Sequence, residues 1–134
     1  MSINYVKIFN ELINEFFTEL IEIFPEENKI KVQYNLFQTL SKVNVRKPCT
    51  DFMIRVIPYL EKIAMKDEEF FKGSEKPTFL NAMNFENIWT DDLSVNTKRC
   101  IWNYIKSFLT IGLKVVEMPE ESLHIIQYIT TINY

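Results

Sequence analysis

Apolar side chains recur at steps of three and four residues through the first 24 positions. The main stripe contains Tyr5, Phe9, Leu12, Phe16 and Leu20, and charged residues occupy the opposite face, namely Lys7, Glu11, Glu15, Glu19 and Glu22. This spacing matches the period of an α-helix. Pro25 lacks an N–H donor and restricts the residue before it. The pattern therefore predicts an amphipathic helix from about residue 4 to residue 24.

Two further helical patterns follow. The first covers about residues 27–43, with acids in its first turn and four residues facing inward, namely Ile30, Tyr34, Phe37 and Leu40. Residues 44–50 are expected to form a loop, and Thr50 is expected to cap the next helix. That helix uses Phe52, Val56, Leu60 and Ile63. Pro58 lies inside the pattern, so a kink or a split is expected there.

The periodic signal is lost between residues 67 and 94. A short charged turn is expected before Gly73, which favours a left-handed conformation at the end of a helix. Residues 73–94 contain Pro77 and five Asx residues. We expect a long connection here, with one or two short helical turns.

The longest apolar pattern begins near residue 95. Ile101, Ile105, Phe108 and Val115 lie on one face, and further apolar side chains lie elsewhere around the helix. A helix that is apolar on most sides usually occupies the centre of a bundle. A last helix is expected to begin at Pro119. The chain is therefore predicted to be all-α, with residues 1–134 forming a single-domain bundle of five or six helices around an apolar helix near residues 95–116.

Composition and charge limit the classes of function. The chain has 134 residues, of which 47% are hydrophobic, and it has only two glycines, so phosphate-binding glycine loops are not expected. The net charge is −3, but its sign alternates along the chain. Residues 1–28 and 67–92 are acidic, whereas residues 29–66 carry eight basic side chains against two acidic ones. A basic band of this size can attract an acidic partner or phosphates.

The cellular context is predicted from the two cysteines and the lack of a targeting signal. Cys49 and Cys100 suit a reducing compartment as free thiols, which usually pack as small buried side chains. The N-terminus lacks the unbroken apolar run of a signal peptide, and the most apolar window is too short to span a membrane. A soluble, intracellular protein with no membrane span is expected.

Candidate catalytic residues are few. His124 is the only histidine and has no clustered partner for a metal. Asp91 and Asp92 are adjacent on an expected turn, so their side chains diverge and a helix-capping role is favoured. The common phosphate-binding, hydrolase and metalloprotease motifs are missing. No catalytic residue, metal or cofactor is therefore assigned, and a non-enzymatic protein is predicted.

Nucleic-acid binding is the first alternative, and it depends on the basic 29–66 segment. Lys42, Arg46 and Lys47 are its candidate phosphate contacts, with Arg46 and Lys47 beside Pro48 in the expected loop. The acidic bands on both sides argue against it, as does the lack of a helix-turn-helix signature.

The segment 84–108 carries a recognisable pattern. It contains Asn84-Phe85, Ile88-Trp89, Asp92-Leu93-Ser94, Thr97-Lys98-Arg99 and Ile101-Trp102-Asn103-Tyr104. This resembles a motif in uncharacterised small helical proteins of nucleocytoplasmic large DNA viruses (giant viruses). The run from Phe9 to Leu12 and the pair Phe24-Pro25 are also similar to those proteins. The resemblance implies a viral accessory protein located in the host cytoplasm, in the virion, or in both, and it supplies no site residues.

The same segment supplies a candidate surface for protein partners, viral or host. Trp and Arg are enriched in interface hot spots, so Trp89, Lys98, Arg99 and Trp102 are the candidate contact residues. Both tryptophans can alternatively belong to the core. Asp92 or Ser94 can cap the helix that begins near Val95, and Asp91 or an acid of a partner can offset the basic pair. Homo-oligomerisation is also possible.

A viral Bcl-2-like apoptosis regulator is the second alternative. Proteins of that class resemble this chain in wrapping amphipathic helices around an apolar central helix, here near residues 95–116. The N-W-G-R motif of that family is missing from this sequence.

Overall fold

Helices make up the ordered elements of the chain. The computed structural model describes residues 2–72, 83 and 85–133 and contains no strand in them. The elements are α1 (Tyr5–Ile23), α2 (Asn28–Val43), α3 (Lys47–Val56), the 3-10 turn η1 (Ile57–Tyr59), α4 (Leu60–Ala64), α5 (Glu69–Lys72), α6 (Phe85–Ile88), α7 (Val95–Gly112) and α8 (Glu120–Thr131). The predicted all-α bundle is confirmed.

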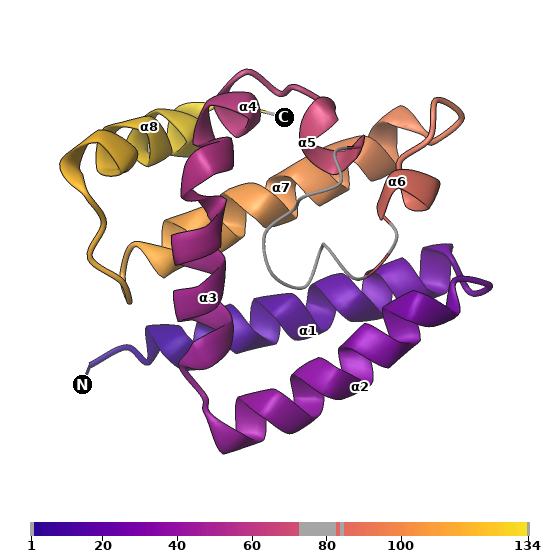
Figure 1. The fold of residues 1–134 in the computed structure, drawn as a ribbon, viewed down its shortest axis with the longest axis horizontal. Helices are drawn as coiled ribbons and strands as arrows, with labels where there is room; N and C mark the ends of the chain where they lie inside the picture. Colours follow the sequence, from indigo (N-terminus) through magenta and orange to yellow (C-terminus); the bar gives the residue numbers. More distant parts are fainter. Residues whose placement is uncertain (1, 73–82, 84, 134) are drawn as a thin grey trace.

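Helix α7 lies at the centre of the bundle, as predicted. It packs against α1, α3 and α8, while α2 packs against α1 and α4 packs against α8. In Figure 1, α1 and α2 run side by side below α7, α3 crosses both layers, and α4 and α8 lie together on the other side. The helix ends at Gly112 rather than near residue 116, because the chain turns at residues 113–116.

Aromatic side chains form the contact between these helices. Three fully buried rings contact one another with centroids 5.6–6.0 Å apart, namely those of Phe9 in α1, Phe52 in α3 and Phe108 in α7. Phe16 adds a perpendicular contact to Phe108 at 5.6 Å. Edge-on and tilted arrangements of this kind are the favoured geometries of aromatic rings.

The first helix follows its sequence pattern closely. The side chain of Asn4 accepts a hydrogen bond from the Lys7 amide at 3.1 Å, and Phe24, just before Pro25, ends the helix. The second helix departs from its pattern. It has no acid in its first turn, it buries only Ile30, and Leu40 is 44% exposed instead of facing inward.

The loop expected at residues 44–50 is shorter than predicted, because its second half belongs to the third helix. This helix begins at Lys47, with Pro48 in its first turn and Thr50 already inside the helix. Proline is well suited to this position because its φ angle is helical and the first turn does not need its N–H. The expectation at Pro58 is confirmed, since η1 separates α3 from α4 there.

The remaining segments show smaller differences. Residues 69–72 form the short helix α5 rather than a turn. Pro119 precedes the first residue of α8 instead of being that residue. The expected cap at Gly73 and the connection from 73 to 82 lie outside the described residues.

Candidate functional site

Both tryptophans lie in an aromatic cluster inside the protein. The Phe71 ring stacks on Trp89 at 4.1 Å and meets Trp102 edge-on at 4.7 Å between centroids. Trp89 is 1% exposed and Trp102 is 6% exposed. The two indoles are therefore core residues in this structure, and the alternative of exposed contact anchors is not supported. Removing the apolar surface of the two indoles from water stabilises the folded state.

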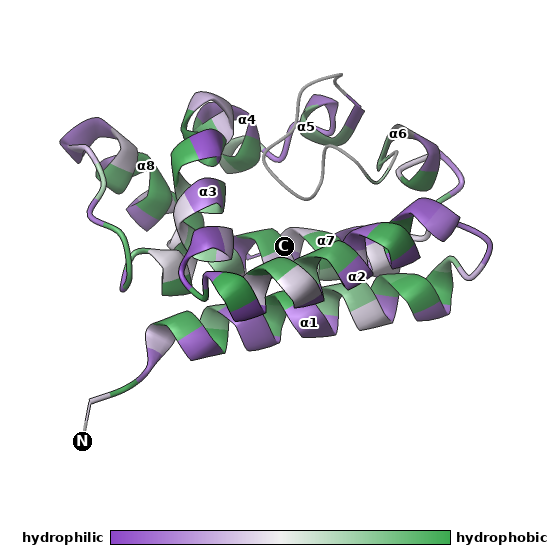
Figure 2. Ribbon diagram, turned by 60° about the horizontal axis from the view of Figure 1, so that its bottom comes forward, coloured by the Kyte–Doolittle hydropathy of each residue, from purple (hydrophilic) through white to green (hydrophobic). Residues whose placement is uncertain are grey.

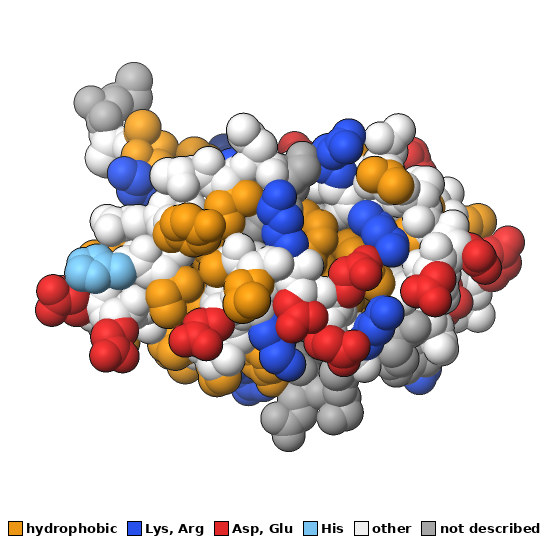
Figure 3. All heavy atoms as spheres, turned by 90° about the horizontal axis from the view of Figure 1, so that it is seen from above, with side chains coloured by type: hydrophobic (Ala, Val, Ile, Leu, Met, Phe, Trp, Pro, Cys, Tyr) orange, Lys and Arg blue, Asp and Glu red, His pale blue; other side chains and the backbone are white. Residues whose placement is uncertain are grey.

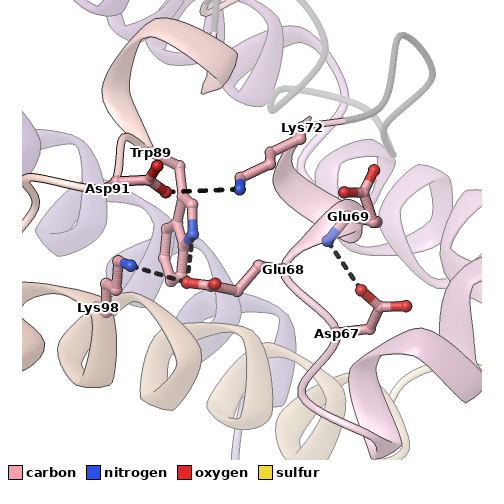
Figure 4. A network of polar contacts seen from close by, with 7 residues as sticks. All are labelled: Asp67, Glu68, Glu69, Lys72, Trp89, Asp91 and Lys98. Carbon is pink, nitrogen blue, oxygen red and sulfur yellow. Dashed lines mark hydrogen bonds and ion pairs between the residues drawn. The ribbon is translucent and has the colours of Figure 1, made fainter.

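A polar network closes one side of this cluster (Figure 4). The indole nitrogen Nε1 of Trp89 donates to Glu68 Oε1 at 2.9 Å, and Lys98 Nζ lies 2.8 Å from the same oxygen. Lys98 Nζ also lies 5.5 Å from the centroid of the Trp89 ring. These hydrogen bonds hold the pKa of the Glu68 carboxyl below its ordinary range. Glu68 thus joins the segment before α5 to the first turn of α7.

The basic pair at the start of α7 is divided between two environments. Lys98 is partly buried in the Glu68 network, whereas Arg99 is exposed. The carboxylate that offsets Lys98 is Glu68, not Asp91, which instead lies 3.8 Å from Lys72 Nζ (Figure 4). Of the two expected caps, Asp92 and Ser94, the structure shows Ser94. Its side chain accepts a hydrogen bond from the Thr97 amide at 3.1 Å.

The candidate phosphate contacts lie at the junction of α2 and α3. Lys42 is exposed in the last turn of α2. Arg46 Nη2 donates to the Val115 carbonyl at 3.3 Å, and Lys47 Nζ forms an ion pair with Asp51 at 3.2 Å. Arg46 and Lys47 are therefore not in a free loop, and each already has an intramolecular partner.

An apolar groove lies between α2 and α3. It measures about 380 Å³ and is lined by Gln33, Leu36, Phe37, Leu40, Lys47, Pro48, Asp51 and Arg55. Two of these lining residues, Leu36 and Leu40, belong to a row of exposed apolar side chains on α2. The row follows intervals of four, four and three residues and consists of Val32, Leu36, Leu40 and Val43, which are between 44% and 81% exposed. Hydrophobic residues recur along α2 in Figure 2, where this helix comes forward. This row lies on the side of α2 that the bundle does not cover.

Groups with chemical reactivity are dispersed. His124 is exposed and lines a shallow apolar hollow with Met65 and Tyr128, on the face seen in Figure 3. Cys49 is buried, and burial raises the pKa of its thiol to about 11, while Cys100 is exposed, contrary to the expectation for a free cysteine. Within the described residues, no group of three or more His, Cys, Asp and Glu side chains is placed to hold a metal. No described helix has the length and apolar character needed to cross a membrane.

Two features of these surfaces were not predicted from the sequence. Glu68 gives no signal in the sequence, because its partners Trp89 and Lys98 come from distant positions and residues 66–71 predict only a charged turn. The row on α2 did leave a signal, since Val32 and Val43 fall outside the inward stripe of that helix. A helix with apolar residues on two faces has more apolar surface than one contact can bury.

In comparisons with known proteins, no protein-family model, no curated protein and no solved structure matches this chain.

Proposed function

We propose that this chain is a non-enzymatic helical accessory protein that acts through contacts with other proteins. The observation that carries this proposal is the exposed apolar row on α2 beside the α2–α3 groove. Contiguous exposed apolar surface is typical of interaction sites in proteins that otherwise bury such side chains. The contact surface is thereby moved from the Trp89–Trp102 region to α2 and α3.

The viral context is part of the proposal and is supported by the sequence motif in residues 84–108. On this basis the protein works as a virion component or as an adaptor in the host cytoplasm. Mass spectrometry of purified virions, together with affinity purification from infected cells, separates these two roles. Absence from both virions and infected cells removes the viral assignment.

A differential purification tests the contact surface. The paired change Leu36→Asp with Leu40→Asp places two charges in the exposed row. Met65→Asp is the control, because Met65 is an exposed apolar side chain that directly follows α4. Circular dichroism checks that all three proteins fold. A partner that is recovered by the wild type and the control, and lost by the paired variant, supports the proposal. A set of partners that is unchanged by the paired variant contradicts it.

Nucleic-acid association is the second candidate function, because the basic segment 29–66 is exposed at Lys42 and Lys47. Binding of duplex DNA that weakens with salt and falls in a variant with Lys42→Ala and Lys47→Ala supports this alternative.

The Bcl-2-like alternative predicts binding of BH3-type peptides, and titration with such peptides decides it.

A further inference from the structure

The lining of the α2–α3 groove combines four apolar residues with four polar or charged ones. Leu36, Phe37, Leu40 and Pro48 supply the apolar lining. Helix α2 has 16 residues and is therefore about 24 Å long, which is enough to align a partner helix of similar length. A partner helix enters such a groove with apolar side chains spaced by three and four residues. The shape and the lining thus favour an amphipathic helix as occupant.

The two helices that form the groove are basic, and Lys47 and Arg55 of these helices line the groove itself together with the acidic Asp51. The stretch from residue 28 to residue 56 carries six basic side chains against one acidic one, in a chain whose net charge is −3. The basic residues are Lys29, Lys31, Lys42, Arg46, Lys47 and Arg55, and the acid is Asp51. Charge complementarity across an interface steers the encounter and excludes partners of the wrong sign.

Arg55 is the basic side chain that is best placed to meet a partner. It lines the groove and is exposed, and it has no hydrogen bond or ion pair within the described residues. Arg46 and Lys47, by contrast, already contact Val115 and Asp51. An arginine at the edge of an apolar pocket is a common interface anchor because it can bind a carboxylate with two parallel hydrogen bonds.

A second copy of this chain fits the groove less well. In a twofold dimer the same surface would face itself, so the basic α2–α3 surfaces would oppose each other across the interface. Like charges in apposition are unfavourable. A partner helix with an acidic polar face has no such conflict.

We infer that the α2–α3 groove binds an acidic amphipathic helix of another protein, with its apolar side chains on Leu36 and Leu40 and its carboxylates near Arg55. This inference depends on the proposed function, because it names the partner class of the same surface. It adds the sign of the partner's charge. An experiment can refute this charge preference while the proposed protein-contact function stands.

Three synthetic helical peptides test the inference. They share one apolar face with leucines spaced by three and four residues, and their polar faces carry Glu, Gln or Lys. Each exposed ion pair is expected to change the affinity by a factor of about two to five. With one such pair at Arg55, the Glu peptide should bind about two- to fivefold more tightly than the Gln peptide in fluorescence anisotropy at about 50 mM salt. This preference should shrink at about 300 mM salt, because the charges are screened.

Two variants locate the effect. Arg55→Glu should remove the preference for the Glu peptide and favour the Lys peptide, and Leu36→Asp should weaken all three. Lys62→Glu is the matched control, because Lys62 is exposed on α4 and its substitution makes the same change of charge at a residue that does not line the groove. The control should behave as the wild type.

The remaining outcomes each overturn the inference. Equal binding of the Glu and Gln peptides, lost in Leu36→Asp, would leave the proposed contact function intact and remove the charge preference. Failure of all three peptides to bind would remove the helix as occupant. Duplex DNA that binds more tightly than the Glu peptide, and is sensitive to Arg55→Glu but not to Leu36→Asp, would favour the nucleic-acid alternative. A concentration-dependent dimer that is lost in Leu36→Asp would show that a second copy occupies the surface.

Discussion

Replacing Glu68 with alanine removes the acceptor of a partly buried hydrogen bond at one side of the aromatic cluster. The Trp89 indole nitrogen lies 2.9 Å from the Glu68 carboxylate, and Trp89 itself is 1% exposed. In Glu68→Ala the indole N–H stays in the core without its partner. A buried donor left unsatisfied costs about 1–3 kcal/mol.

The ion pair between Glu68 and Lys98 adds less to this figure. The two side chains are 42% and 23% exposed, so water screens their attraction. We therefore expect the free energy of unfolding to fall by about 1 kcal/mol at neutral pH, because the bond to Trp89 is only partly buried. The total for a typical domain is about 5–15 kcal/mol. Urea denaturation followed by far-UV circular dichroism measures this loss. Glu69→Ala is the control, because Glu69 is the exposed neighbour and the change of charge is the same.

The pH dependence gives a second, independent check. The pKa of the Glu68 carboxyl is lowered from 4.5 by hydrogen bonds from Lys98 and Trp89. Its stabilising contribution is therefore fully present above pH 4.5 and is lost as the pH falls through the lower pKa of the folded state. The difference in stability between wild type and Glu68→Ala should shrink over that range. The reasoning is refuted if Glu68→Ala is no less stable than Glu69→Ala at neutral pH, or if the difference between wild type and Glu68→Ala does not shrink at all in acid.

Three further predictions concern the core and the thiols. Phe71→Ala should lower the unfolding free energy by about 3–5 kcal/mol and the thermal midpoint by about 10–20 °C, because it leaves a cavity in the aromatic cluster; a drop of only a few degrees would contradict this. Gly112→Ala should cost about 1–3 kcal/mol, since its Cβ would overlap the buried Met53 side chain. Adding Met53→Ala should cost less than the sum of both changes, and a stabilising Gly112→Ala would refute the predicted overlap. In the folded protein Cys100 should react quickly with a thiol reagent at about pH 8, whereas Cys49, with its pKa raised to about 11, should react only on unfolding; equal rates would refute the assignment.

The sequence by itself determined the class of fold and most helix positions. The stripe from Tyr5 to Leu20, the break at Pro58 and the cap at Ser94 depend on interactions within a few residues, and the structure confirms each of them. Pro48 shows the limit of such local signals. A proline can precede a helix or occupy its first turn, and here the chain begins α3 at Lys47.

Only the tertiary structure decided which apolar and charged side chains meet. Trp102 and Leu40 both belong to apolar patterns, yet Trp102 is buried and Leu40 is exposed, because the first lies against Phe71 and the second lies beyond the contact of α2 with the bundle. Glu68 meets Lys98 across 30 positions of sequence, so no local spacing could pair them. The spacing of apolar residues predicts that a helix has an apolar face. Whether that face is buried depends on which distant helices pack against it, and a face that no helix covers stays exposed.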